Sequence, residues 1–341
     1  MNTLKTLLLT SCMLAFFSVA AQSKKYVLIL AKGEQKMVVL DYESLDSITK
    51  IPVGEDPHEV VTNDSGTLAY VSVPILNGKG HEINIINLQT LQPEKSFDTK
   101  PLYTPHGLAY INDKLWFTAQ GSKAVGIYNP HSGQTEQVLG TGQDFTHLIY
   151  VKPDGSTFYS TNVESGTVSI YEKKEIPPYM PPTGVLPANA KPRTEWRQTL
   201  VNVGFGAEGF DLSPDGKELW TARPDGHIII VDTEAKKVKA GINTNTPGFH
   251  RLKFTPDGKT VCIVSVKTGD LLYYNSRTRQ QEQKVHIGQS AGIYMDAPSN
   301  RMFISCTPNN DVVVIDLASR KEIRRLAISR PDGITAVVVK E

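Results

Sequence analysis

The sequence predicts an all-β fold, a seven-bladed β-propeller, on the basis of three observations. Six internal repeats follow one another, and four of the five steps between them measure 41 to 48 residues. Each repeat contains four short segments in which apolar and polar residues alternate, as in strands that are half-buried between neighbouring sheets. The two ends of the chain carry complementary parts of a seventh repeat. Four short strands in a repeat of about 42 residues are typical of a propeller blade.

The first half of each repeat is an apolar strand, a turn, and a second strand with an aromatic residue near its centre. The repeats begin at His58, His106, His147, Glu208, His250 and Ala291. The aromatic position of the second strand holds Tyr70, Trp116, Tyr159, Trp220, Cys262 and Phe303. Asp-Gly pairs lie between the two strands at 154–155, 215–216 and 257–258. Such pairs favour tight hairpin turns, so we interpret these carboxylates as turn residues.

A third alternating strand continues every repeat, and a weaker fourth strand follows it. The third strands are expected at 83–88, 124–129, 167–172, 227–232, 270–275 and 311–316. The seventh repeat is split: residues 332–339 match an innermost strand, and the outer strands lie at 26–31, 37–41 and 47–54. We therefore expect the C-terminal strand to pair with N-terminal strands and close the ring without an open sheet edge. A two-domain sandwich, the alternative, does not explain why the two ends complement each other.

Residues 1–21 are predicted to be a secretory signal peptide, which leaves 22–341 as the propeller. A short basic start and an apolar stretch precede the small residues Ala20 and Ala21, where cleavage is expected. The mature protein is then periplasmic or extracellular. Cys12 lies in a segment that resembles a lipoprotein box, but apolar residues continue beyond it, so export is favoured over lipidation. The mature chain has no apolar run of transmembrane length.

Two cysteines, Cys262 and Cys306, remain after signal removal. Both lie in apolar strand-like runs, where a thiol behaves as a small hydrophobic group. Their positions in the aligned repeats place them on opposite sides of their sheets. On this ground we expect two free thiols rather than a disulfide.

Composition narrows the range of partners. Of the 341 residues 40% are hydrophobic and 21% are charged, close to the average for globular proteins. The net charge of +1 argues against a dedicated nucleic-acid-binding protein, which would carry a basic patch. We expect a monomer whose partner is a small molecule or an extracellular protein or glycan.

The repeats resemble those of a known group of propellers. The segments SPDGKELWTA at 213–222 and YSTN at 159–162 are similar to the YVTN-repeat propellers, which are mostly exported or surface proteins of bacteria. This resemblance extends over the mature chain and implies the fold, but it implies no activity, because propellers host unrelated functions. The segments 105–107 and 115–118 also resemble the repeat of streptogramin-type lyases, which are metal-dependent propellers. The other repeats depart from that pattern.

The leading residues of the repeats are expected to converge at one mouth of the central channel, because the innermost strand of every blade lines that channel. Around the axis this ring would consist of His58, His106, His147, Glu208, His250, Ala291 and Asp332. The chain has eight histidines, and four of them occupy these seven positions. This concentration of imidazoles is the strongest functional signal in the sequence.

Converging imidazoles favour a divalent transition metal, here Zn, Cu, Fe or Mn. The four ring histidines would be ligands, with Glu208 as a further ligand or as the acceptor that orients a liganding imidazole. Carotenoid-cleaving oxygenases and the nitrous oxide reductase propeller hold metals in comparable axial rings, which is an analogy of architecture only. The expected function is a metal-dependent enzyme, lyase- or hydrolase-like, acting on a small molecule. The alternatives are a water-filled polar channel and a non-catalytic binding or scaffolding propeller.

Further residues are candidates for supporting the ring or for binding a substrate. They are Asp332 in the ring itself, Asn162 and Arg223 at the ends of second strands, and His81 on a glycine-rich loop. An insertion at 173–195 interrupts the third repeat and contains six prolines. It is expected to stay extended, as a cap, a docking loop or a tolerated insertion.

Overall fold

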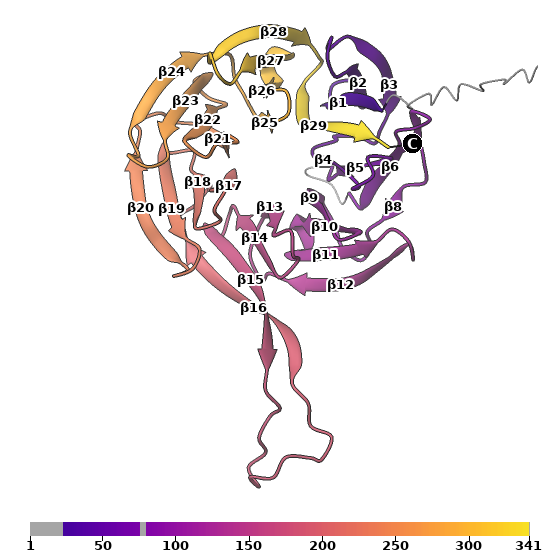
Figure 1. Ribbon diagram of the computed structural model, residues 1–341, viewed down its shortest axis with the longest axis vertical. Helices are drawn as coiled ribbons and strands as arrows, with labels where there is room; N and C mark the ends of the chain where they lie inside the picture. The colour runs from indigo at the N-terminus through magenta and orange to yellow at the C-terminus, as the bar shows by residue number, and fades with distance from the viewer. Residues whose placement is uncertain (1–22, 76–79, 341) are drawn as a thin grey trace, which may run out of the picture.

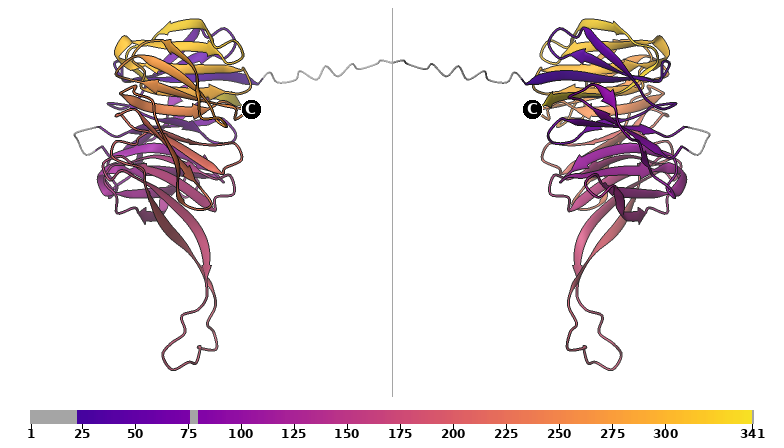
Figure 2. Two further views of the ribbon diagram at one scale, coloured as in Figure 1. Left: turned by 90° about the vertical axis from the view of Figure 1, so that its left-hand side faces the viewer. Right: turned by 90° about the vertical axis from the view of Figure 1, so that its right-hand side faces the viewer.

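The computed structural model describes residues 23–75 and 80–340 and is a seven-bladed β-propeller, as predicted. Figure 1, viewed along the channel, shows the blades as sectors of a ring around a central opening, and Figure 2 shows the disc from its two edges. Each blade is an antiparallel sheet, and in the six blades of continuous sequence the first strand faces the channel and the last lies at the rim.

Six blades, numbered here from 1 to 6, each correspond to one repeat. Blade 1 contains β4 (Val60–Thr62), β5 (Leu68–Val73), β6 (Glu82–Asn87), β7 (Gln92–Pro93) and β8 (Phe97–Asp98). Blade 2 contains β9 (Pro105–Ile111), β10 (Lys114–Ala119), β11 (Ala124–Asn129) and β12 (Gln134–Gly140). Blade 3 contains β13 (Thr146–Val151), β14 (Thr157–Asn162), β15 (Thr167–Ile176) and β16 (Arg193–Asn202). In blade 1 both β7 and β8 pair with β6, so the outermost strand is interrupted.

Blade 4 contains β17 (Phe210–Leu212), β18 (Glu218–Ala222), β19 (His227–Asp232) and β20 (Lys237–Asn243). Blade 5 contains β21 (Phe249–Phe254), β22 (Thr260–Ser265), β23 (Asp270–Asn275) and β24 (Gln281–His286). Blade 6 contains β25 (Gly292–Asp296), β26 (Arg301–Cys306), β27 (Asp311–Asp316) and β28 (Lys321–Ala327). The third strands lie within a residue of their predicted starts, and β15 alone extends well beyond its expected end.

The seventh, closing blade joins the two ends of the chain. Its strands are β29 (Pro331–Val339), β1 (Lys24–Ala31), β2 (Lys36–Asp41) and β3 (Ser47–Pro52), in that order from the channel outward. The register between β29 and β1 runs from the pair Lys24–Val339 to the pair Ala31–Pro331. The predicted closure is therefore confirmed.

Apolar layers between neighbouring blades form the core. In the described part of the chain there are seven such layers, one for each pair of adjacent blades. The predicted aromatic position contributes a buried side chain to six of them, in each case toward the following blade. Burying a large aromatic side chain contributes about 2 kcal/mol, so these positions carry much of the stability.

The cysteines are free and buried, as expected, but the reasoning from opposite sheet faces is wrong. Cys262 in β22 and Cys306 in β26 belong to the same apolar layer, because blades 5 and 6 are neighbours. Because the two blades are adjacent, opposite faces of their sheets pack against each other, and this places both cysteines in the same layer. Both thiols are nevertheless free, and Cys306 Sγ lies 3.4 Å from the Ser290 hydroxyl.

The proline-rich insertion forms a long arm that leaves the rim of blade 3. The ladder between β15 and β16 continues beyond the blade to the pair Ile176–Arg193. Residues 177–192 form the irregular tip, which Figure 1 shows projecting away from the disc. The ends of the predicted insertion are thus paired strand, and its middle is extended and non-helical, as expected.

Two short 3-10 helices complete the described elements, η1 (Gln120–Ser122) and η2 (Thr307–Asn309). Over residues 23–75 and 80–340 no helix is long and apolar enough to cross a membrane. The predicted signal peptide and Cys12 lie outside the described residues.

Candidate functional site

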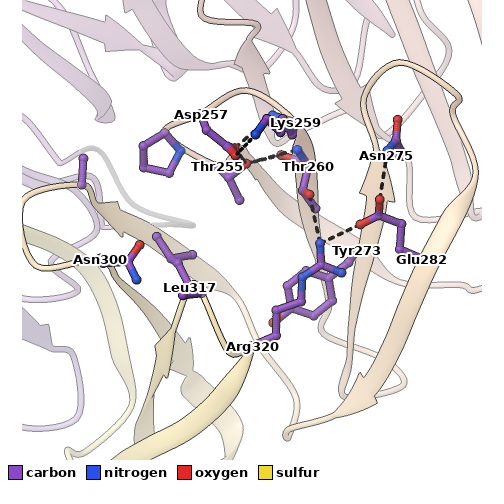
Figure 3. Close-up of a pocket in the computed structure, with 13 residues that line it drawn as sticks. Thr255, Asp257, Lys259, Thr260, Tyr273, Asn275, Glu282, Asn300, Leu317 and Arg320 are labelled. Atoms are coloured by element: carbon purple, nitrogen blue, oxygen red, sulfur yellow. Dashed lines mark hydrogen bonds and ion pairs between the residues drawn. The ribbon is translucent and has the colours of Figure 1, made fainter.

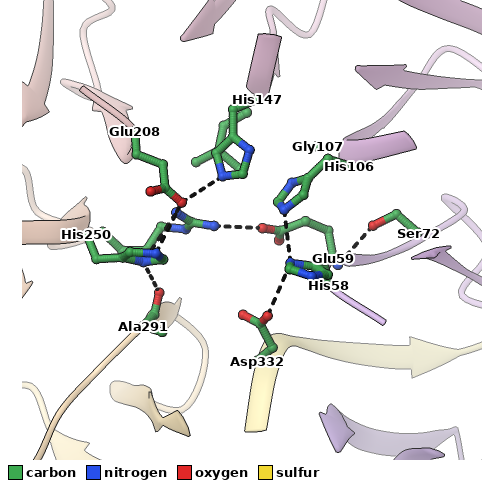
Figure 4. A network of polar contacts seen from close by, with 12 residues as sticks. His58, Glu59, Ser72, His106, Gly107, His147, Glu208, His250, Ala291 and Asp332 are labelled. Carbon is green, nitrogen blue, oxygen red and sulfur yellow. Dashed lines mark hydrogen bonds and ion pairs between the residues drawn. The ribbon is translucent and has the colours of Figure 1, made fainter. Parts of the chain in front are cut away.

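The leading residues of the inner strands meet at the channel axis, as the repeats predict (Figure 4). Six of the seven are joined in a chain of side-chain contacts. Going round, Asp332 Oδ2 lies 3.4 Å from His58 Nδ1, which lies 3.0 Å from His106 Nε2. The rings of His106 and His147 follow, with centroids 3.9 Å apart. The chain continues with His147 Nε2 to Glu208 Oε1 at 2.7 Å and Glu208 Oε1 to His250 Nε2 at 3.2 Å.

Lys32 contacts two members of this chain, His58 and Asp332. Its ammonium lies 2.7 Å from His58 Nε2 and 3.0 Å from Asp332 Oδ2. The same Nε2 lies 3.2 Å from Asp56 Oδ2, so it faces both a donor and an acceptor. His58 Nδ1 and His106 Nε2 share one hydrogen bond, in which either ring can be the donor. The other nitrogen of His106, Nδ1, is buried and has no hydrogen-bond partner among the described residues.

Gln120 and Glu208 fix the tautomer of His147. The Gln120 side-chain amide contacts His147 Nδ1, and His147 Nε2 donates to Glu208. Burial lowers the pKa of His147 to about 4, although the Glu208 carboxylate favours the charged imidazole. Burial and the two neighbouring imidazoles likewise hold the pKa of His106 well below its ordinary value. Both side chains are therefore neutral at physiological pH.

Arg251 links two carboxylates across the axis. Its guanidinium contacts Glu208 Oε1 at 2.5 Å and Glu59 Oε1 at 3.4 Å. Burial alone would raise the pKa of Glu208, but His250, His147 and Arg251 hold it well below the ordinary value. Burial raises the pKa of Glu59, and Arg251 opposes this effect only in part. Glu208 is thus the firmly ionised carboxylate of the ring.

His250 has the most accessible imidazole of the ring, with 25% of its side chain exposed. Its Nδ1 donates to the Ala291 carbonyl at 2.7 Å, so in the neutral ring Nε2 bears a lone pair. Burial lowers the pKa of His250, which favours that neutral form. The lone pair faces Glu208 Oε1, another acceptor, at 3.2 Å. A water or ligand hydroxyl that donates to either acceptor has to lie beside the line that joins them, because 3.2 Å leaves no room for an oxygen atom between the two.

The backbone of the ring is fixed by the preceding blade. Hydroxyl groups of second strands donate to the carbonyls of leading residues: Thr118 to His147, Thr161 to Glu208 at 2.8 Å, and Ser305 to Asp332. Gly107 follows a leading residue, and a Cβ there would lie 2.5 Å from the His147 carbonyl oxygen. Adjacent inner strands can therefore approach closely only because this position is glycine.

Carboxylates outnumber permanent cations in the cluster. The carboxylates are Asp56, Glu59, Glu208 and Asp332, and the cations are Lys32 and Arg251. This surplus of negative charge would favour a further cation. The arrangement nevertheless does not fit a bound metal, since the Arg251 guanidinium contacts the Glu208 oxygen on which the two Nε2 atoms converge. Across the described residues, no group of three or more His, Cys, Asp or Glu side chains is arranged to hold a metal ion.

The other predicted site residues have partners outside the ring. Asn162 is fully buried and hydrogen-bonds Thr146 and Ser169 within blade 3. Arg223 forms a bidentate pair with Asp225 two residues away. His81 contacts Asp98 Oδ1 at 3.1 Å on the edge of blade 1. A role for these residues in substrate binding stays a prediction.

Residues that the sequence reasoning missed complete the cluster: Lys32, Asp56, Glu59, Gln120 and Arg251. Four of them occupy positions that an alignment of the repeats could have identified. Glu59 and Arg251 directly follow leading residues, whereas four other leading residues are followed by glycine, at Gly107, Gly209, Gly292 and Gly333. Lys32 and Gln120 follow the alanine that ends a second strand, the position of Arg223 in blade 4. Of the three residues at this position, Lys32 and Gln120 contact ring histidines, whereas Arg223 pairs with Asp225.

Deeper in the channel, the inner strands enclose a cavity of about 160 Å³ that includes Glu59 and Arg251 among its lining residues. Known ligand pockets occupy about 300–1,000 Å³, so a metabolite would have to meet the ring from the mouth. A larger hollow of about 510 Å³ lies between blades 5 and 6 (Figure 3). Its main cation, Arg320, lies over the Tyr273 ring and pairs with Glu282 at 2.7 Å, so its charge is already balanced.

Comparison with known proteins identifies the fold and no family. No protein-family profile matches the chain, and no match was found among curated proteins. A putative 6-phosphogluconolactonase from Bacteroides fragilis is similar in structure, with a TM-score of 0.72, 12% identity, and 93% of this chain and 99% of that chain covered. A functionally unknown protein from Desulfotomaculum acetoxidans gives a TM-score of 0.69 at 12% identity, covering 92% and 99% of the two chains.

The dihydro-heme d1 dehydrogenase NirN, solved in complex with DHE, has a TM-score of 0.61 and 14% identity, with 92% of this chain and 75% of that chain covered. At such low identities these similarities show the propeller fold alone.

Proposed function

We propose that the axial cluster is a general-base site that hydrolyses an ester or lactone bond in a small molecule. The observation that supports this most is the state of His250. Its Nδ1 is occupied by the Ala291 carbonyl, its Nε2 carries the lone pair, and its side chain is the most accessible imidazole of the ring. An imidazole with a fixed tautomer and an available nitrogen is the usual general base in hydrolysis.

The proposed reaction uses groups already in contact. His250 Nε2 takes a proton from water while the water oxygen attacks the carbonyl carbon. Glu208, ionised and held by Arg251 and His147, stabilises the imidazolium that forms. When the tetrahedral intermediate collapses, the carbon–oxygen ester bond breaks and His250 returns the proton to the leaving oxygen. Lactones are the suggested substrate class because the similar propeller from Bacteroides fragilis is described as a putative 6-phosphogluconolactonase.

Hydrolysis of 6-phosphogluconolactone and glucono-δ-lactone, followed by proton NMR above the spontaneous rate, tests the proposal. We expect acceleration by the wild type and a loss of about 100-fold or more in kcat/KM for His250→Ala. His286→Ala is the matched control, since His286 lies in the outer strand of the same blade with an exposed side chain. The proposal fails if the wild type accelerates neither reaction, or if His250→Ala keeps its rate. A non-catalytic binding role would then replace it.

A metal site is the second candidate, and the surplus of carboxylates over cations favours it. Zn, Cu, Fe or Mn could occupy the ring only if the Arg251 guanidinium withdrew from Glu208. Elemental analysis of protein purified without a histidine tag, before and after incubation with each metal, tests this candidate. A stoichiometric metal that is lost in His147→Ala/His250→Ala would support it. Protein that stays metal-free throughout would reject it.

We also propose that the mature propeller acts outside the cytoplasm as a monomeric YVTN-type protein. The apolar N-terminal segment and the small residues that follow it support export. Intact mass and N-terminal sequence of the exported protein test this. Cleavage after Ala20 or Ala21 is expected, whereas a lipid-modified Cys12 at the N-terminus would show anchoring instead.

A further inference from the structure

We propose that the arm of blade 3 docks the propeller onto an anionic lipid surface, with its proline-rich tip in the interface. This inference is independent of the axial site. The arm is defined here as residues 173–197, and its tip as residues 177–192. Figures 1 and 2 show the tip standing clear of the disc, so a planar surface can reach it.

Large apolar side chains are gathered at the tip and exposed. Tyr179 is 73% exposed and Val185 is 71% exposed, and Met180 and Leu186 are also exposed. Four of the eleven exposed large hydrophobic side chains of the described residues therefore lie in this one loop. A folded protein gains nothing from holding such a group in water, so the tip is suited to bury itself in an apolar environment.

The backbone of the tip suits a lipid interface. Six of its residues are proline, which has no N–H group. Two tight turns satisfy further donors, Gly184 N–H to Pro181 O and Ala190 N–H to Pro187 O, each at 2.9 Å. Unpaired N–H groups are the main penalty for moving irregular backbone out of water. The tip therefore enters an interface at lower cost than an ordinary loop of the same length.

The net positive charge of the arm favours an anionic surface. Residues 173–197 contain five Lys or Arg residues and two Glu residues, a net charge of +3, whereas the whole chain has +1. The remainder of the chain is therefore at −2. The basic side chains, all exposed, are Lys173, Lys174, Lys191, Arg193 and Arg197. An apolar tip with a collar of Lys and Arg matches the acyl boundary and the headgroup layer of an anionic bilayer.

Co-sedimentation with vesicles tests the proposal, using pure phosphatidylcholine and an equimolar mixture of phosphatidylcholine and phosphatidylglycerol. We expect the wild type to bind the anionic vesicles and to dissociate as salt is added. Tyr179→Ser/Val185→Ser should weaken binding about tenfold or more, because two apolar anchors are lost. Lys174→Gln/Lys191→Gln should weaken it about fivefold for each lysine removed.

Phe205→Ser is the matched control, since Phe205 is 72% exposed but lies outside the arm. It should bind as the wild type does. A Tyr179→Trp variant adds a direct readout, a blue shift of its fluorescence on binding. Retention of wild-type binding by Tyr179→Ser/Val185→Ser would overturn the proposal. Failure of the wild type to sediment with anionic vesicles would overturn it as well, and would assign the tip to a protein partner.

Discussion

Lys32 and Asp332, 300 positions apart in the sequence, form an ion pair of 3.0 Å at the channel mouth. Lys32 follows β1 and Asp332 lies in β29, so the pair joins the two chain ends within the closing blade. The same ammonium contacts Asp56 at 3.1 Å and His58 at 2.7 Å. One cation thus connects ring closure to the axial cluster.

Replacing Lys32 by Met is expected to destabilise the protein by about 3 kcal/mol or more, because it leaves Asp56 and Asp332 close together without their shared cation. Chemical denaturation measures the loss. Lys50→Met is the control: Lys50 belongs to the same blade, but its pair with Glu34 is exposed and should contribute less than about 1 kcal/mol. Equal losses in the two variants would show that the network does not stabilise closure.

Stability should fall as the pH is lowered from neutrality, and His147 is one cause. Its pKa is lowered from 6.5 to about 4 in the folded protein, so between these values the unfolded chain binds the proton more readily. The contribution of His147 is present above pH 6.5 and is lost as the pH falls toward 4. A shift of this size corresponds to about 3 kcal/mol.

Denaturation curves of the wild type and His147→Gln between pH 7 and pH 4 check this prediction, and the variant should have the flatter profile. His131→Gln removes an imidazole on an exposed turn and should leave the profile unchanged. Parallel profiles for the wild type and His147→Gln would contradict the assignment.

Arg251→Leu should cost about 3–5 kcal/mol of stability, because Glu208 and Glu59 lose the guanidinium between them. Adding Glu208→Gln to this variant removes the uncompensated charge and should recover part of the loss. A double-mutant cycle by chemical denaturation gives the coupling free energy. Additive effects of the two substitutions would mean that the contact carries no net energy.

Gly107→Ala should destabilise the protein by about 1–3 kcal/mol, since the new Cβ would lie 2.5 Å from the His147 carbonyl oxygen. Gly140→Ala offers the comparison: it lies at the end of β12, and its Cβ would meet nothing within 4 Å. Thermal unfolding should therefore separate the two variants. Similar melting temperatures would show that the neighbouring inner strands can move apart freely.

The thiols of Cys262 and Cys306 should resist alkylation in the folded protein. Burial raises the pKa of Cys262 to about 12 and that of Cys306 to about 11, so almost no thiolate forms near neutral pH. We expect neither to react until denaturant is added, when both should react. Ser132→Cys places a thiol on an exposed turn and should react at once. Rapid labelling of the native wild type would argue against the packing of this layer.

Repetition made the fold predictable and left the charge network hidden. The alignment of repeats located every blade, because each Tyr159-like position must meet the next blade in the same way. It also placed His58, His106 and His147 at one point on the axis. Arg251 escaped because strand alternation specifies which side of a sheet a residue faces and says nothing of how far a long side chain reaches across a channel.

The predicted metal site is subject to the same limit and stays a prediction. The spacing of the repeats predicted that the imidazoles converge. It could not show that Arg251 contacts Glu208 Oε1, the oxygen that His147 and His250 also face. Asn162 was predicted to lie near the face that carries the ring, yet its side-chain amide forms hydrogen bonds with Thr146 and Ser169 within its own blade. The hydrogen-bond partners of a buried side chain depend on the packed structure, so the repeat pattern of the sequence does not reveal them.

The split blade determines which part of the propeller can be completed last during synthesis. Blades 1 to 6 are continuous stretches of chain and can form as soon as each has been synthesised. The strands β1, β2 and β3 are made first, but their partner β29 is made last among the described strands. Until residue 339 has been added, the edge of β1 stays open to pairing with another chain. A chain that ended before that point would have six complete blades and an unpaired strand edge on β1.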